Sequence, residues 1–318
     1  MIIAIVNPAA CQQRGPEIAN ALLGAAPRLR LVMSDQPQDV DAVVAMVQQE
    51  APELLVVVGG DGTLLNILTR FERAGAWAHV PPLLVLPAGH INTTATALVG
   101  ARGPAALAAR ILRAWGRGVR RLRRVPVQRL EVGGRTERVG VTISVGAAAR
   151  THEDYDRAML QGPLGIAEVL ARFAVQQLPR DRFRPLGGRV LVDSEPVPLP
   201  RVTAGVLSPL PGFFVGVRPF RGVRAVSSEG IHVALSGLGA TATQASLPAI
   251  VRGHRPPGVN LYFGRHHELA WTSDFRPDIV AIDGELVPIT PRTHVRISQH
   301  GHVRFLVWRS MPRSGEQC

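Results

Sequence analysis

The chain has 318 residues, of which 46% are hydrophobic and 19% are charged, so it can bury a sizeable core and form two domains. Its apolar runs are far shorter than the about 18 residues that a membrane span needs, and its N-terminus lacks the basic region and cleavage site of a signal peptide. The only two cysteines, Cys11 and Cys318, exclude a disulfide scaffold. We therefore expect a cytoplasmic protein.

The formal net charge is +12, and all 36 basic residues are arginines. The absence of lysine excludes a Walker A loop, the protein-kinase fold and Schiff-base chemistry, because each depends on a lysine side chain. A positive surface can attract nucleic acid or an anionic membrane, whereas a GC-rich genome produces arginine without any function. Because only 5% of residues are aromatic and no nucleic-acid reader motif is recognisable, we expect no nucleic-acid partner.

In the first third of the chain, apolar strand patterns alternate with helical patterns. Strands are expected at residues 1–7, 29–34, 54–58 and 82–87, and helices at residues 17–25, 39–49 and 64–71. This alternation is typical of right-handed crossovers in a mostly parallel sheet that is buried on both faces. The sequence predicts a doubly wound α/β domain over residues 1–124.

Beyond residue 124, short alternating runs separated by glycine and proline replace this pattern. Strands are expected at residues 125–132, 138–146, 189–199, 202–207, 213–220, 230–236, 278–283, 294–299 and 302–308, and one or two helices at residues 154–178. Such spacing favours an antiparallel sandwich or barrel. The second predicted domain, residues 125–318, is therefore β-rich and sandwich-like, and the boundary is expected near residues 116–126.

The segment 56–66, VVVGGDGTLLN, places three glycines and an acid between a strand and a helix. Ligands of an open parallel sheet bind beyond the carboxyl ends of its strands, where glycines and a helix N-terminus favour a phosphate. Asp61 would repel that phosphate unless it serves a metal ion or removes a proton. The segment predicts a nucleotide-phosphate turn with an acid for Mg²⁺ or for a hydroxyl. The alternative is a structural turn in which Asp61 caps the helix.

GGDGTLLN resembles the signature of the superfamily of diacylglycerol, sphingosine and NAD kinases. Three further segments resemble the diacylglycerol kinase branch in the same order: IVNP at 5–8, LPAGHINTTATAL at 86–98 and IDGELV at 282–287. Together the four segments span most of the chain. The resemblance implies an N-terminal α/β domain, a β-rich C-terminal domain, ATP in the cleft between them and transfer of the γ-phosphoryl group to an alcohol.

The resemblance also implies a set of site residues. Asp61, Asp283 and Glu285 would be the catalytic acids that serve Mg²⁺ and the substrate hydroxyl. The nucleotide would be lined by Asn7, Ser34, Gly59, Gly60, Gly62, Thr63, Gly89 and Asn92. We expect an ATP- and Mg²⁺-dependent kinase that phosphorylates diacylglycerol or a related lipid.

Two departures from the family pattern motivate alternatives. Many relatives read GTGND where residues 89–93 read GHINT, so the acid after the asparagine is absent, and residues 141–146 lack the family's asparagine before Ser-x-Gly. One alternative is NAD kinase, which shares GGDGT. The other is a nucleotide-binding regulator without catalysis.

The segment 117–124, RGVRRLRR, carries five arginines, and the basic stripe upstream of it lies opposite Leu107, Ile111 and Trp115. On a helix this pattern can lie on a membrane surface. We therefore predict reversible, salt-sensitive contact with an anionic membrane, at its inner face. The alternative is a solvated hinge between the domains.

Overall fold

The computed structural model describes residues 1–9, 15–89, 92–100, 103–156, 158–160, 162–175, 180–212, 219–220, 223, 226–251, 254 and 260–308. The chain divides into two compact units. Unit 1 comprises Met1–Val125 and His302–Cys318, and unit 2 comprises Pro126–Gly301. Two strands, β5 (Leu122–Val132) and β16 (His294–Leu306), contain the points where the chain passes from one unit to the other.

Unit 1 is built on a parallel sheet with the strand order β2-β1-β3-β4. Its strands are β1 (Ile2–Val6), β2 (Arg30–Met33), β3 (Leu54–Gly59) and β4 (Leu83–Pro87). Every residue of β3 and β4 is buried, because helices cover both faces of the sheet. The predicted strands of the first third are therefore confirmed, with their ends shifted by a few residues at most.

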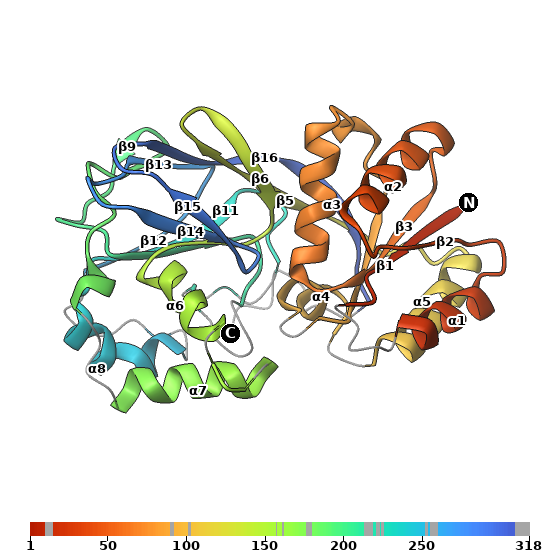
Figure 1. The fold of residues 1–318 in the computed structure, drawn as a ribbon, viewed down its shortest axis with the longest axis horizontal. Coiled ribbons are helices and arrows are strands. Elements are labelled where there is room, and N and C mark those ends of the chain that lie inside the picture. Colours follow the sequence, from red (N-terminus) through yellow and green to blue (C-terminus); the bar gives the residue numbers. More distant parts are fainter. Residues whose placement is uncertain are drawn as a thin grey trace, which may run out of the picture. The chain divides into compact units, whose positions relative to one another are not determined.

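Helices α1 (Gly15–Ala25) and α5 (Pro104–Gly116) pack together on one face of this sheet, and α2 (Pro37–Glu50) and α3 (Asp61–Arg73) pack on the other (Figure 1). The short helices η1 (Trp77–His79) and α4 (Thr93–Leu98) flank β4 in the sequence. The buried residues of α2 lie at the predicted helical spacing; they are Val40, Val43, Val44 and Val47. Unit 1 is thus the predicted doubly wound α/β unit.

The far end of β16 completes unit 1. Phe305 pairs with Leu83 of β4 in parallel, and the Trp308 N–H donates to the carbonyl of Leu98 at 3.1 Å. The guanidinium of Arg110 in α5 lies 5.5 Å from the centre of the Trp308 ring. A strand from the end of the sequence therefore extends the sheet that the first third of the chain forms.

Unit 2 is dominated by antiparallel strands, so the predicted fold class is confirmed. A six-stranded sheet has the order β12-β11-β10-β7-β14-β15, and β5, β6, β8, β9, β13 and β16 form a further antiparallel array. Their bounds are β6 (Arg135–Gly140), β7 (Ile143–Gly146), β8 (Leu191–Val192), β9 (Glu195–Pro196), β10 (Ala204–Ser208), β11 (Ile231–Ser236), β12 (Leu261–His266), β13 (Glu268–Thr272), β14 (Asp278–Ile282) and β15 (Glu285–Ile289).

Several strand predictions need correction. The run 138–146 divides into β6 and β7, because the N–H groups of Val141 and Thr142 donate to the Asp283 carboxylate instead of to a neighbouring strand. The two runs predicted at 294–299 and 302–308 form the single strand β16. The run 213–220 lies almost entirely outside the described residues. Strands β12, β13 and β15 were not predicted.

Four helical segments accompany these strands: α6 (Ala147–Asp156), α7 (Gly162–Val175), η2 (Arg180–Phe183) and α8 (Ala240–Val251). Helix α6 contacts β7, β10 and β14, and α7 contacts α6 and α8 (Figure 1). Helix α7 lies within the predicted helical run 154–178, whereas α6 begins at Ala147 and overlaps that run only at residues 154–156, so the predicted start was wrong. Within the described part of the chain, no helix combines the length and the apolar character needed to cross a bilayer.

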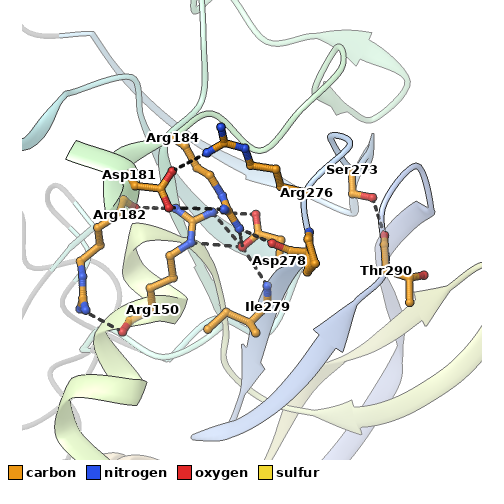
Figure 2. A network of polar contacts seen from close by, with 10 residues as sticks. Arg150, Asp181, Arg182, Arg184, Ser273, Arg276, Asp278, Ile279 and Thr290 are labelled. Carbon is orange, nitrogen blue, oxygen red and sulfur yellow. Dashed lines mark hydrogen bonds and ion pairs between the residues drawn. The ribbon is translucent and has the colours of Figure 1, made fainter. Parts of the chain in front are cut away.

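An ion pair with little solvent exposure ties α6 to the six-stranded sheet (Figure 2). The Arg150 guanidinium donates to both carboxylate oxygens of Asp278, at 2.8 and 2.7 Å, and also to the carbonyl of Arg182. The side chains of Arg150 and Asp278 are only 8% and 10% exposed. Because Asp278 is the first residue of β14, this pair fixes the start of the strand that leads to Asp283.

Candidate functional site

The strand order of unit 1 reverses between β1 and β3, which is where ligands of open α/β sheets bind. Asn7 directly follows β1, and its N–H donates to the Val58 carbonyl at 2.9 Å. Its side-chain nitrogen Nδ2 donates to Oγ1 of Thr63 at 3.0 Å. Ser34 follows β2, and its N–H donates to the carbonyl of Val6 at 2.8 Å. The structure thus brings Asn7, Ser34 and Thr63 to one edge of the sheet.

Two glycine-bearing turns meet at this edge, one after β3 and one after β4. A Cβ on Gly60 would lie 3.3 Å from Cα of Gly89, and a Cβ on Gly89 would lie 3.0 Å from the nitrogen of Gly60. A Cβ on Gly59 would overlap the Thr63 side chain. The two turns therefore pack backbone against backbone, an approach that side chains at these positions would prevent.

Asn92 shapes the second turn. Its backbone φ is 54°, in the left-handed region that asparagine tolerates better than most residues. Its Oδ1 accepts the Gly89 N–H at 2.7 Å, and its Nδ2 donates to the Gly89 carbonyl. The Asn92 side chain thus bonds both backbone groups of Gly89, whereas the predicted loop residues 90 and 91 lie outside the described residues.

The carboxylate of Asp61 links the two turns. It accepts the N–H of Thr93 at 2.7 Å and the N–H of Thr94 at 3.0 Å. Burial raises the pKa of Asp61, and these hydrogen bonds, which favour the ionised form, oppose that rise. The N-cap of α3 is Gly60. Asp61 therefore caps helix α4, which follows the neighbouring turn. The structural alternative, in which Asp61 caps the helix that starts at Asp61 itself, is wrong.

This edge fits the phosphates that the family resemblance implies. The 13-residue helix α3 starts at Asp61, and its first N–H groups, including that of Gly62, have no acceptor within the helix. These groups and the helix dipole attract anions, and the glycines leave room for close approach. No group of three or more potential ligands among the described His, Cys, Asp and Glu residues could hold a metal ion. If Mg²⁺ binds at this edge, phosphate oxygens and water would supply most of its ligands.

The predicted acids Asp283 and Glu285 belong to unit 2. Asp283 and Gly284 form the two-residue turn between β14 and β15, with φ values of 47° and 90°. The Asp283 carboxylate accepts the N–H groups of Val141 and Thr142, both at 2.8 Å. The turn and its hydrogen bonds therefore hold this carboxylate in one orientation. Glu285, the first residue of β15, is exposed.

Sequence reasoning missed several residues around the two aspartates. Thr93 and Thr94 contribute backbone N–H groups, which no side-chain motif reveals. Gly140 leaves room for Asp283, because a Cβ there would overlap Oδ2 of that residue. A glycine inside a strand pattern often marks such a close approach, so Gly140 carried a signal that could have been used. How the acids of unit 2 meet the turns of unit 1 stays a prediction.

The arginine segment 117–124 and the helix before it do not form the predicted amphipathic surface. Leu107, Ile111 and Trp115 are buried in unit 1 and cannot face a membrane. The guanidinium of Arg120 stacks 3.7 Å from the Trp115 ring centre and lies 3.3 Å from a carboxylate oxygen of Glu53. Membrane contact through the remaining arginines stays a prediction, and it would have to rest on charge alone.

The fold and the site define a two-unit protein whose α/β unit carries two packed glycine turns at the switch point of its sheet. Residues 1–121 match the family described as the diacylglycerol kinase catalytic domain, which confirms the resemblance seen in the sequence. A search of the curated proteins found no match.

Solved structures agree in fold along nearly the whole chain. A diacylglycerol kinase from Bacillus anthracis str. Sterne superposes with a TM-score of 0.64 at 14% identity, covering 98% of both chains. A candidate diacylglycerol kinase from the same organism superposes with a TM-score of 0.67 at 16% identity, covering 96% of both chains. At this identity the likeness establishes the fold of both units and leaves the reaction open.

Proposed function

We propose that the protein is an ATP- and Mg²⁺-dependent lipid kinase that phosphorylates the hydroxyl group of diacylglycerol or a related lipid. The observation that carries the proposal is the meeting of the two glycine turns at the switch point of the unit that matches the diacylglycerol kinase catalytic domain. The two similar Bacillus anthracis proteins are named as the same class of enzyme.

In this proposal the turn at residues 59–63 binds phosphate oxygens through its backbone N–H groups, and Asn7 holds Thr63 beside them. When bound, ATP with Mg²⁺ supplies the phosphoryl group and much of the charge neutralisation. The chain has no lysine that could neutralise the charge of the phosphates. Asp61 keeps the turn before α4 in place and offers its remaining lone pairs to the metal.

We assign to Asp283 the removal of the proton from the acceptor hydroxyl. One of its carboxylate oxygens accepts the N–H of Val141 and the other accepts the N–H of Thr142, and a carboxylate positioned in this way can act as a general base. Its orientation is fixed before the substrate binds, which is the condition for efficient proton transfer. Glu285, two residues further along the chain and exposed, is assigned to Mg²⁺ or to the lipid head group.

Transfer of label from γ-labelled ATP tests the proposal most broadly. The protein is incubated with Mg²⁺ and either a lipid extract in micelles or NAD in solution. Label in the lipid fraction supports the proposal, and label in NAD would replace it with NAD kinase activity. Bound ATP without label in either acceptor would favour a regulator without catalysis.

A further inference from the structure

Three large apolar side chains are exposed together where α6 gives way to α7. Met159 is 86% exposed, Leu160 48% and Leu164 65%, and they lie within six residues of each other. The other large apolar side chains that are exposed in the described residues lie elsewhere in the sequence; they are Met1, Leu23, Val119, Leu122 and Phe275. We call Met159, Leu160 and Leu164 the apolar tip.

The apolar tip continues along helix α7. Ala167 and Ala171 are exposed and lie three and seven residues beyond Leu164, so all three share one face of the helix. Val169, on another face, is buried in a cluster with Ala147. Helix α7 is therefore apolar on a solvent-exposed face as well as on its packed face, a pattern that is typical of a helix with a partner on both sides.

The structure holds the apolar tip in a defined conformation. The Glu168 carboxylate accepts the N–H of Leu160 at 3.0 Å and that of Met159 at 3.4 Å, and it pairs with Arg172 one turn further on. These bonds lower the pKa of Glu168. Gly165 lets α7 approach the tip, because a Cβ there would overlap the Leu160 carbonyl. The tip can thus leave water with these two backbone N–H groups already satisfied.

Size and charge indicate what covers the tip. Three partly exposed side chains offer roughly half of the about 800 Å² per partner that a stable protein interface buries. A lipid surface sets no such minimum, because each inserted side chain contributes on its own. The chain as a whole carries a formal charge of +12, which attracts it over long range to a surface of opposite sign before the tip makes contact.

We propose that the apolar tip inserts into the surface of an anionic phospholipid bilayer and brings the enzyme to its lipid substrate. The inference rests on the proposed lipid kinase function, since it supplies the route by which the enzyme reaches an acceptor held in a bilayer. It moves the membrane contact from the arginine segment 117–124 to unit 2.

The test is sedimentation with vesicles of phosphatidylcholine and phosphatidylserine, without diacylglycerol and without ATP. Replacing Met159, Leu160 and Leu164 together by glutamine should weaken vesicle binding about tenfold or more. Phe275→Gln is the matched control, because Phe275 is 64% exposed but lies outside the tip, and it should bind like the wild type. Leu164→Gln alone should weaken vesicle binding by a smaller factor. This single variant keeps the inference testable if the triple variant folds poorly.

Vesicle binding decides this inference independently of the kinase assay, because no phosphoryl transfer is needed. Unchanged binding of the triple variant would overturn it, as would an equal loss in Phe275→Gln. Sedimentation velocity provides a further check. A wild type that dimerises and a triple variant that does not, with equal vesicle binding, would make the tip a contact between copies of the chain.

Discussion

The carboxylate of Asp61 and the backbone N–H of Thr93 form a hydrogen bond of 2.7 Å between residues 32 positions apart. Through it, the acid of the first glycine turn caps the helix that follows the second turn. The signature acid thus has a positioning role in unit 1 in addition to the metal or proton chemistry proposed for it. A change at Asp61 should therefore disturb both turns.

Asp61→Asn keeps the size of the side chain but presents an amide nitrogen to one of the two N–H groups. The lost acceptor should lower the free energy of unfolding by about 1–3 kcal/mol while the protein still folds. Metal-dependent turnover should fall on the order of 100-fold. Thermal unfolding and a kinase assay measure the two effects. Turnover close to the wild-type value would remove Asp61 from the proposed catalytic set.

Gly89→Ala tests the contact between the two glycine turns. The added Cβ would press on the backbone of Gly60 and should lower the free energy of unfolding by about 1–3 kcal/mol. The nucleotide affinity should also fall, because the added Cβ pushes the two glycine turns apart. Gly24→Ala is the matched control: that glycine lies in α1, has open space around it and should gain about 0.5–1 kcal/mol. Equal unfolding and nucleotide binding of the two variants would refute the packing argument.

The Arg150–Asp278 pair offers a test of buried charge in unit 2 (Figure 2). Arg150→Met leaves the Asp278 carboxylate with a weaker set of partners, and we expect a loss of about 3–5 kcal/mol in the free energy of unfolding. The double variant Arg150→Met/Asp278→Leu should recover much of the lost free energy of unfolding. Arg276→Met removes the exposed pair with Asp181 and should cost less than about 1 kcal/mol. Urea unfolding measures all three, and equal costs for the two arginines would contradict the assignment.

His152 should make stability depend on pH. Burial lowers the pKa of His152 from 6.5 to about 4, so the unfolded chain takes up a proton at a higher pH than the folded protein does. The contribution to stability is therefore present above pH 6.5 and is lost as the pH falls towards about 4. Relative to His152→Gln, the wild type should lose about 3 kcal/mol over that range. Urea unfolding at a series of pH values measures this effect, and equal pH profiles of the wild type and His152→Gln would contradict the assignment.

Unit 1 could be predicted from the sequence because its strands are almost wholly apolar and its helices keep a clear period. Residues 54–58 and Val40 to Val47 of α2 are examples of these two patterns. In unit 2 several strands are short, such as β8 and β9, and β15 contains Pro288, which is unusual in a strand. The return of β16 to the sheet of unit 1 depends on pairing between Phe305 and Leu83, and no local pattern encodes such a distant pairing.

The candidate site, too, could be predicted from the sequence only in part. Glycines 59, 60 and 89 carry their role in their residue type, since only glycine permits so close an approach of two turns. The partners of Asp61 and Asp283 are backbone N–H groups, which every residue except proline possesses. Tertiary packing alone selects Thr93, Thr94, Val141 and Thr142 for that role. The acids could therefore be predicted, but the hydrogen bonds that orient them could not.

The most direct measurement is transfer of phosphate from γ-labelled ATP to purified diacylglycerol in mixed micelles with Mg²⁺, comparing the wild type with Asp283→Asn. The wild type should form labelled phosphatidic acid. The variant should lose turnover on the order of 100-fold while its ATP affinity changes much less, because Asp283 is assigned to the acceptor hydroxyl. Wild-type protein that binds ATP but labels neither diacylglycerol nor any other lipid would contradict the account.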